Sequence, residues 1–239
     1  MRLFMFIYIG KDEDTKEESG MENKIERLTI KRIMIYIIGI LFVSLGIVLC
    51  KKCGMGISPI SSIPFVLSYV TPLTFGNWTT LFHFTNTILQ MLLAKRWLDI
   101  KLWLQIPLAF CFGWAIDGFN YLIVIDNRVL FYQIIALILS VFFTALGMVC
   151  MLEMNLIQNP PDGTVKQISI MIKKDIGTVK IGYDVICVLV SIFVSLVFLH
   201  KIEGFGLATI VSAIFVGKTV NWIKNMLLHI KSRRRMIIR

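Results

Sequence analysis

Long apolar segments, separated by short polar or basic stretches, recur along this chain of 239 residues. They lie near residues 33–50, 78–94, 102–125, 129–152, 181–199 and 205–223. A transmembrane helix needs about 20 mostly apolar residues, because the hydrocarbon core of a bilayer is roughly 30 Å thick. The six segments reach or approach this length. The pattern therefore predicts an all-α fold, a polytopic membrane helix bundle with six transmembrane helices.

Two further apolar stretches are too short to cross a bilayer. One covers residues 57–70 and the other lies around residues 165–172. Segments of this length are more typical of re-entrant or interfacial helices than of spans. If both crossed, the bundle would have eight helices, and Lys166 with the lysines at 173 and 174 would enter the membrane. A central lysine costs about 2.5–3.5 kcal/mol on insertion scales, so we favour six spans.

A weak internal repeat relates the two halves of the chain. The residues matched at a constant offset of 101 positions include Gly46 with Gly147, Pro59 with Pro160, Gly76 with Gly177, and Phe42 with Phe143. Further along, the offset becomes 104, which aligns Gly113 with Gly217. Each half holds an odd number of predicted spans, so the second half must enter the membrane upside down. We predict two inverted repeats, residues 33–126 and 127–225, each with a short re-entrant or interfacial helix.

The distribution of basic residues predicts the orientation. With the N-terminus in the cytoplasm and the first 20 residues left aside, eighteen Lys and Arg residues fall on the cytoplasmic side and four on the other. Such an excess marks the cytoplasmic loops of membrane proteins. We therefore expect a multi-pass protein of the bacterial cytoplasmic (inner) membrane, with both termini in the cytoplasm.

Two tails flank the predicted membrane region. Residues 1–32 form a cytoplasmic N-terminal tail, of which residues 1–20 are expected to be disordered or, with Met21 as the start, not translated. Residues 226–239 form a basic cytoplasmic tail. Its expected partners are the anionic lipid headgroups of the bilayer, which attract clustered Lys and Arg side chains.

The composition agrees with a membrane protein. Hydrophobic residues make up 56% and charged residues 17% of the chain, and the mean hydropathy is +0.77. A soluble domain has about 45–50% apolar and about 25% charged residues. The net charge of +10 follows the predicted cytoplasmic loops instead of forming one basic surface, so we expect no nucleic acid partner.

The chain lacks the motifs of common enzyme classes. It contains no phosphate-binding Gly-x-x-x-x-Gly-Lys-Ser/Thr, no His-Glu-x-x-His and no Gly-x-Ser-x-Gly. Cys50-Lys-Lys-Cys53 has the spacing of a redox or metal pair, but no second pair or nearby histidine completes a site. We interpret it as a chance pair or an incidental disulfide. We expect no enzymatic activity, no cofactor and no metal site.

A polar residue followed by proline occurs at corresponding places in the two halves, as Ser58-Pro59 and Asn159-Pro160. Both pairs are typical of a helix start, where the polar side chain caps the helix and proline fits the first turn. If these helix ends dip into the protein, their free N–H groups would suit an anion or a carbonyl. Alternatively, they are surface turns that begin interfacial helices. Asp162 is either a solvated turn residue or a guard of a cytoplasmic entrance.

Polar residues line one face of the second predicted span. His83, Asn86 and Gln90 are spaced i, i+3 and i+7, and Asp184 occupies the register of His83 in the second half. Such groups form either an access path, proton-linked because histidine titrates near neutrality, or hydrogen bonds between helices worth about 0.6–2 kcal/mol each. The candidate substrate path comprises Ser58, Pro59, His83, Asn86, Gln90, Asn159, Pro160, Asp162 and Asp184.

Four motifs stand out between residues 30 and 225, namely Gly54-Met-Gly-Ile-Ser-Pro59, Gly76-Asn-Trp78, Gln90 and Asn159-Pro-Pro-Asp-Gly163. In these motifs the chain resembles the YczE/YyaS/YitT family of bacterial integral membrane proteins, in particular its YczE branch. The resemblance implies a multi-span inner-membrane protein and brings no established substrate. We expect a secondary-transporter-like or permease-like protein for an unknown small molecule or ion. The alternative is a non-transporting membrane accessory or assembly factor.

Overall fold

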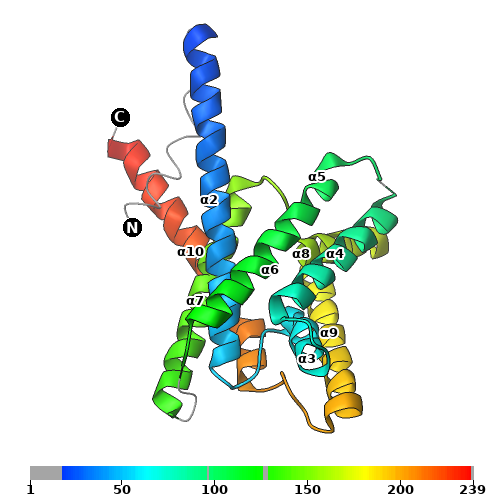
Figure 1. The fold of residues 1–239 in the computed structure, drawn as a ribbon. Helices are drawn as coiled ribbons and strands as arrows, with labels where there is room; N and C mark the ends of the chain where they lie inside the picture. The colour runs from blue at the N-terminus through cyan, green and yellow to red at the C-terminus, as the bar shows by residue number, and fades with distance from the viewer. Residues whose placement is uncertain (1–17, 96, 126–128, 238–239) are drawn as a thin grey trace.

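The computed structural model describes residues 18–237 except residues 96 and 126–128, and side chains from residue 29 to residue 229. Within this part of the chain all regular structure is helical, as predicted (Figure 1). The first described helix already begins at Glu18, and the expectation for residues 1–20 otherwise lies outside the described residues. The last helix continues into the predicted basic tail as far as Ile237.

The described helices include both long and short ones. They are α2 (Glu18–Lys52), the 3-10 turn η2 (Pro59–Ser61), α3 (Ser62–Val70), α4 (Phe75–Ala94), α5 (Ile100–Trp103), α6 (Gln105–Leu122), α7 (Leu130–Met154), α8 (Pro160–Ile172), α9 (Ile176–Leu199) and α10 (Leu207–Ile237). The pair η2 and α3, and the helix α8, lie where the two short apolar stretches were predicted.

Among the described residues, four helical segments are long and apolar enough to cross a membrane. They are Thr29–Lys52 of α2, Ile100–Leu122 across α5 and α6, Leu130–Met154 of α7 and Ile176–Leu199 of α9. They match four of the six predicted spans and indicate a membrane protein. The other two predicted spans fall on α4 and α10, which are less apolar because polar side chains recur along α4 and lysines interrupt α10. Six spans therefore stay a prediction.

Both short helical pieces begin at the predicted polar-proline pairs. Ser58 is the N-cap residue of η2 and Asn159 that of α8, and each is followed by proline. Neither side chain accepts a hydrogen bond from its own helix backbone, which differs from the usual role of a cap. Instead, Ser58 Oγ donates to Ser61 Oγ at 3.1 Å, and Asn159 Nδ2 donates to Asp162 Oδ2 at 3.1 Å. The two caps therefore bond to neighbouring side chains.

Helices α2 and α7 make the most extensive helix contact in the structure and run in opposite directions (Figure 1). Glycines on both helices allow the backbones to approach. A Cβ atom on Gly46 would lie 2.8 Å from Ser140 O, and one on Gly147 would lie 2.5 Å from Gly39 O. Small residues permit this close packing of helices in a membrane.

The other helices pack around this pair. Helix α6 contacts α2 and α4, α10 contacts α7, α8 contacts α4, and α3 contacts α9. The loop before η2 is tied to the start of α10, since Ile57 N donates to Gly204 O at 3.0 Å and Ala208 N donates to Met55 O at 2.9 Å. The N-terminal end of α10 is thus fixed to the first half of the chain.

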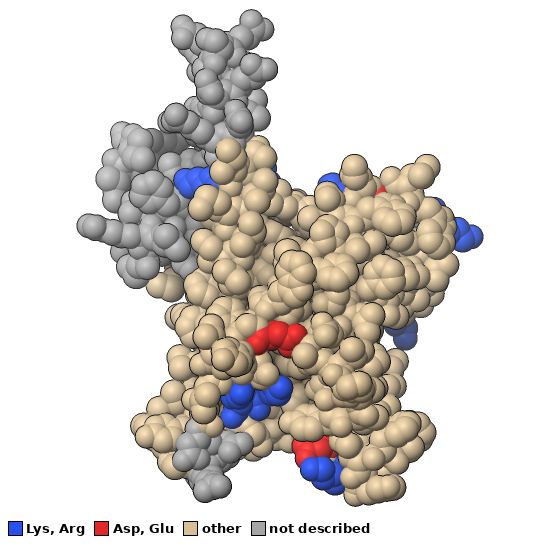
Figure 2. All heavy atoms as spheres, viewed as in Figure 1, with Lys and Arg blue, Asp and Glu red and all other residues tan. Residues whose placement is uncertain are grey.

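The surface fits a lipid environment. On the face drawn in Figure 2 most side chains are uncharged, and the charged ones gather in a few small groups. Large apolar side chains such as Trp114 of α6, Ile138 of α7 and Phe193 of α9 are each more than 60% exposed. An apolar surface of this extent is unusual for a soluble monomer and marks contact with a membrane or another protein.

Replacing Gly147 tests the contact between α2 and α7. We expect Gly147→Leu to lower the melting temperature of the purified protein in detergent, because the added side chain meets the α2 backbone; overpacking of this kind costs about 1–3 kcal/mol or more. Gly182→Leu is the matched control, because no described atom lies within 4 Å of a Cβ atom at that position. Equal melting temperatures for the two variants would contradict the close contact.

Candidate functional site

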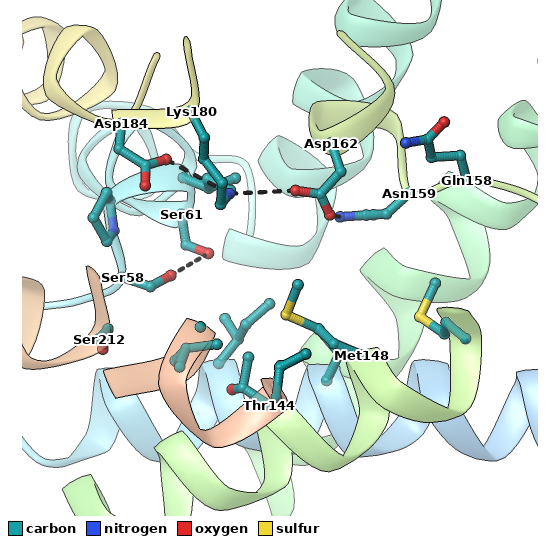
Figure 3. Close-up of a pocket in the computed structure, with 18 of the residues that line it drawn as sticks. Ser58, Ser61, Thr144, Met148, Gln158, Asn159, Asp162, Lys180, Asp184 and Ser212 are labelled. Atoms are coloured by element: carbon teal, nitrogen blue, oxygen red, sulfur yellow. Dashed lines mark hydrogen bonds and ion pairs between the residues drawn. The ribbon is translucent and has the colours of Figure 1, made fainter. Parts of the chain in front are cut away.

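A cavity of about 730 Å³ lies between the two halves of the chain. Its walls come from α2, η2, α3, α4, α6, α7, α8, α9 and α10. Helix α7 contributes Thr144 and Met148, which face the polar groups on the other side of the cavity (Figure 3). Ligand pockets commonly measure about 300–1,000 Å³, so the cavity is large enough for a small molecule.

Charged side chains form one wall. Lys180 of α9 lies between two carboxylates, with its Nζ atom 3.3 Å from Asp162 Oδ1 and 3.9 Å from Asp184 Oδ1 (Figure 3). Asp162 also accepts the hydrogen bond from Asn159. Lys166 lines the cavity as well and is exposed. The lining therefore carries charges of both signs, held by the beginning of α8 and one face of α9.

Hydroxyl groups from other elements line the same cavity. Ser58 and Ser61 belong to the start of the short helix in the first half, and Ser212 belongs to α10 (Figure 3). Ser212 Oγ is 3.6 Å from Cys50 Sγ, a contact that ties α10 to α2. Polar groups from both halves thus meet across the cavity.

Three polar atoms in the lining residues are buried without a hydrogen-bond partner among the described residues. They are His83 Nδ1, Asn159 Oδ1 and Asp184 Oδ1. An unpaired buried polar atom costs about 1–3 kcal/mol, so such atoms usually bind water or a ligand. Two of the three, the amide and carboxylate oxygens, can only accept hydrogen bonds. The cavity is therefore suited to a molecule that donates them.

The start of α8 offers few donors to a ligand. Pro160 and Pro161 have no backbone N–H, and Gly163 N donates to Asn159 O at 2.9 Å. The two prolines remove two of the donors that a helix start usually presents, and the prediction that this helix end binds an anion stays a prediction.

The family model of DUF6198, a family of unknown function, matches residues 30–225. The chain belongs to this family. No curated protein and no solved structure matches it. Membership in the DUF6198 family brings no activity with it, and the resemblance to the YczE/YyaS/YitT family stays a prediction.

The structure of this DUF6198 protein brings many of the candidate path residues together. Those that line the cavity are Ser58, Pro59, His83, Asn159, Asp162 and Asp184. They come from both halves of the chain and from four different helical elements. His83 and Asp184, which share a register in the internal repeat, both face the same cavity.

The other candidates, Asn86, Gln90 and Pro160, lie in the contact between α4 and α8. Gln90 Nε2 donates to Pro160 O at 2.8 Å and to Gln105 Oε1 at 3.0 Å. Asn86 Oδ1 accepts a hydrogen bond of 2.7 Å from the hydroxyl of Tyr183. These residues match the interpretation as hydrogen bonds between helices, because their polar atoms are occupied by neighbouring helices.

Lys180 is the main residue that sequence reasoning missed. It was counted among the basic residues of a cytoplasmic loop, whereas it belongs to α9 and its ammonium group reaches into the cavity. Its spacing of four residues from Asp184 was the available signal, since residues four apart on a helix are neighbours. Tyr183 and Gln105 were missed because their partners lie far away in the sequence.

Removing the Gln90 side chain tests the packing role of the α4–α8 contact in this DUF6198 protein. We expect Gln90→Ala to lower stability by about 1–3 kcal/mol, because it leaves the buried Gln105 Nε2 without its acceptor and removes one donor each from Gln105 Oε1 and Pro160 O. Thr85→Ala is the control, since the Thr85 hydroxyl is exposed and bonds only within its own helix. Thermal unfolding in detergent measures both. A Gln90→Ala variant as stable as Thr85→Ala would contradict the packing role.

Proposed function

We propose that this protein is a small permease of the secondary-transporter type, with a substrate path through the cavity between two inverted repeats. The observation that carries the proposal is the cavity itself. It combines charges of both signs, acceptor atoms without a hydrogen-bond partner among the described residues, and wall residues from corresponding places in the two halves. Transporters built from inverted repeats bind their substrates at such an interface. The substrate is a small molecule or ion that carries N–H or O–H donors.

The contact between α2 and α7 supports the inverted repeat. Gly46 of α2 packs on Ser140 and Thr144 of α7, whereas Gly147 packs on Gly39 and Val43. Adding the repeat offset of 101 to the α2 residue and subtracting it from the α7 residues converts the first contact into the second. Reciprocal contacts of this kind characterise a two-fold axis, because residue i meets j and the mate of j meets the mate of i.

The contact between Phe42 and Phe143 supports such an axis. They are mates in the repeat, and their ring centroids lie 5.6 Å apart. Two residues that a two-fold axis relates can contact each other only if both lie close to that axis. Two further pairs of helix contacts follow the same rule: α6 on α2 corresponds to α10 on α7, and α8 on α4 corresponds to α3 on α9.

The exposure pattern of α4 supports a fifth span. Five of its polar residues are buried (Thr79, His83, Asn86, Thr87 and Gln90), whereas its exposed large apolar side chains include a stripe of Leu81, Phe84, Ile88 and Leu92. Lipid would therefore meet an apolar surface. The 20 residues of α4 are also long enough for the hydrocarbon core at 1.5 Å per residue. With α10, the repeat partner of α6, as the sixth span, each half has three.

We further propose that the protein lies in the bacterial cytoplasmic membrane with both termini in the cytoplasm. The basic end of α10 then meets anionic lipid headgroups, and the segment 153–180 with its lysines faces the cytoplasm. No enzymatic step is part of this proposal.

Labelling a matched pair of loop residues tests the inverted topology. Leu73 and Lys174 are mates in the repeat, and both are exposed. We expect Leu73→Cys to react with a membrane-impermeant maleimide only from outside the cell, and Lys174→Cys only from the cytoplasmic side of inverted vesicles. A background without the five native cysteines removes competing reactions. Reaction of both positions from the same side would contradict inverted repeats.

Metabolite profiling tests transport. We expect cells that produce the wild-type protein to change the level of a specific metabolite, and cells that produce Asp184→Asn to lose about 90% of this change, because the carboxylate beside Lys180 is removed from the path. Asp99→Asn is the control, since Asp99 caps α5 away from the cavity. If Asp184→Asn behaves like wild type, the accessory or assembly role becomes the better explanation.

A further inference from the structure

The two halves differ at one helix crossing. In the first half α4 and α6 touch, and a Cβ atom on Gly113 of α6 would lie 2.7 Å from Gly76 O of α4. In the second half the mates of these glycines are Gly177 of α9 and Gly217 of α10. No described atom lies within 4 Å of a Cβ atom at Gly217, and among described residues α9 and α10 make no comparable contact. Gly177 and Gly217 instead both line the cavity.

A hydrogen-bonded clasp closes the crossing in the first half. Asp117 of α6 accepts hydrogen bonds from Gly76 N at 2.8 Å and from Thr74 Oγ1 at 2.5 Å. It therefore holds the end of α6 against the first turn of α4. A carboxylate is well suited to this role, because a helix start presents free N–H groups.

The second half has the parts of an equivalent clasp. The mates of Thr74 and Asp117 are Asp175 and Asn221. The Asn221 amide can accept from Gly177 N through its oxygen and donate to the Asp175 carboxylate through its nitrogen. In the structure Gly177 N donates to Asp175 Oδ2 at 2.8 Å, and Asn221 lines the cavity.

Resting on the proposed function, we propose that α10 closes onto α9 in a second conformation, while α6 leaves α4. Gly217 then crosses Gly177, and Asn221 takes the place that Asp117 has in the first half. The cavity, which now extends between α9 and α10, becomes closed there and opens between α4 and α6. This exchange moves the opening of the substrate path from one side of the membrane to the other.

The surroundings of the crossing fit this movement. The start of α10 is tied to residues 55–57, so its N-terminal end can serve as the pivot while Gly217 and Asn221 move. Ile181, the mate of Thr80, lines the cavity and would pack on Gly217 as Thr80 now packs on Gly113. The glycine crossing that opens in one half is thus replaced by a crossing of the same kind in the other half. Two states related in this way can be close in free energy.

Disulfide formation tests the closure directly. The full-length protein, without native cysteines and in membrane vesicles, carries Asp175→Cys with Asn221→Cys. We expect a mild oxidant to link this pair, because closure brings the two side chains together as Thr74 and Asp117 are in the first half. Asp175→Cys with Thr219→Cys is the control, since residue 219 lies on the other side of α10 and should not be linked. Absence of linkage at 175 and 221 would overturn the closure.

A second variant blocks the movement without disturbing the fold. Gly217→Leu fits the described structure, because the space around Gly217 is open. We expect it to leave the melting temperature unchanged and to reduce linkage between 175 and 221 by about tenfold, since the closed state loses population. Gly182→Leu, another open position on α9, should change neither quantity. Full linkage in Gly217→Leu would contradict the glycine crossing.

Water accessibility separates this inference from the proposed function. Asp184→Cys should react with a water-soluble maleimide if the cavity is part of an aqueous path, whereas Ile186→Cys, exposed on the outer surface of α9, should not. If Asp184→Cys does not react with the maleimide, the proposal that the protein is a permease is overturned. Reaction at 184 without linkage at 175 and 221 leaves the permease standing and overturns the closure.

Discussion

The close approach of α2 and α7 is the contact on which the remaining structure depends. Gly46 and Gly147 remove the side chains that would hold these helices apart, so the two halves share one seam. Two further long helices pack directly on this seam, α6 on α2 and α10 on α7, and α4 joins it through α6. In a bilayer the seam depends on packing instead of water exclusion, because lipid tails are as apolar as the helices. Glycine is therefore more valuable here than a larger apolar residue.

The polar residues of α4 divide into two groups with different surroundings. Gln90 and Asn86 are satisfied by α8 and α9, which fixes α4 beside the second half. His83 lies one turn away from Asn86 and leaves a ring nitrogen unpaired beside the cavity. Asn86 and Gln90, which are hydrogen-bonded to other helices, thus share a helix face with His83, which lines the cavity. The hydrogen bonds of the first two residues hold the helix that positions the third.

Local patterns predicted much of this fold. Apolar runs located the long helices, and the proline pairs located the starts of η2 and α8, because both signals act within a few residues. The contact of Gln90 with Pro160 could not be foreseen, since 70 residues separate them. Nor could the position of Lys180, whose charge was assigned to a loop although α9 begins four residues earlier. Cys50 and Cys53, for which two interpretations were open, are free thiols, and Cys53 Sγ donates to Cys50 O.

The matched loops at Leu73 and Lys174 have a consequence for membrane insertion. They occupy the same place in each half, yet one is apolar and the other basic. With the proposed inverted repeat, the bundle has almost the same internal packing in either orientation, so its helix contacts do not determine its orientation in the membrane. That choice is left to a handful of surface lysines and arginines, which interact with the insertion machinery and not with the fold. Polarity and architecture are therefore encoded by separate sets of residues, and either can change without the other.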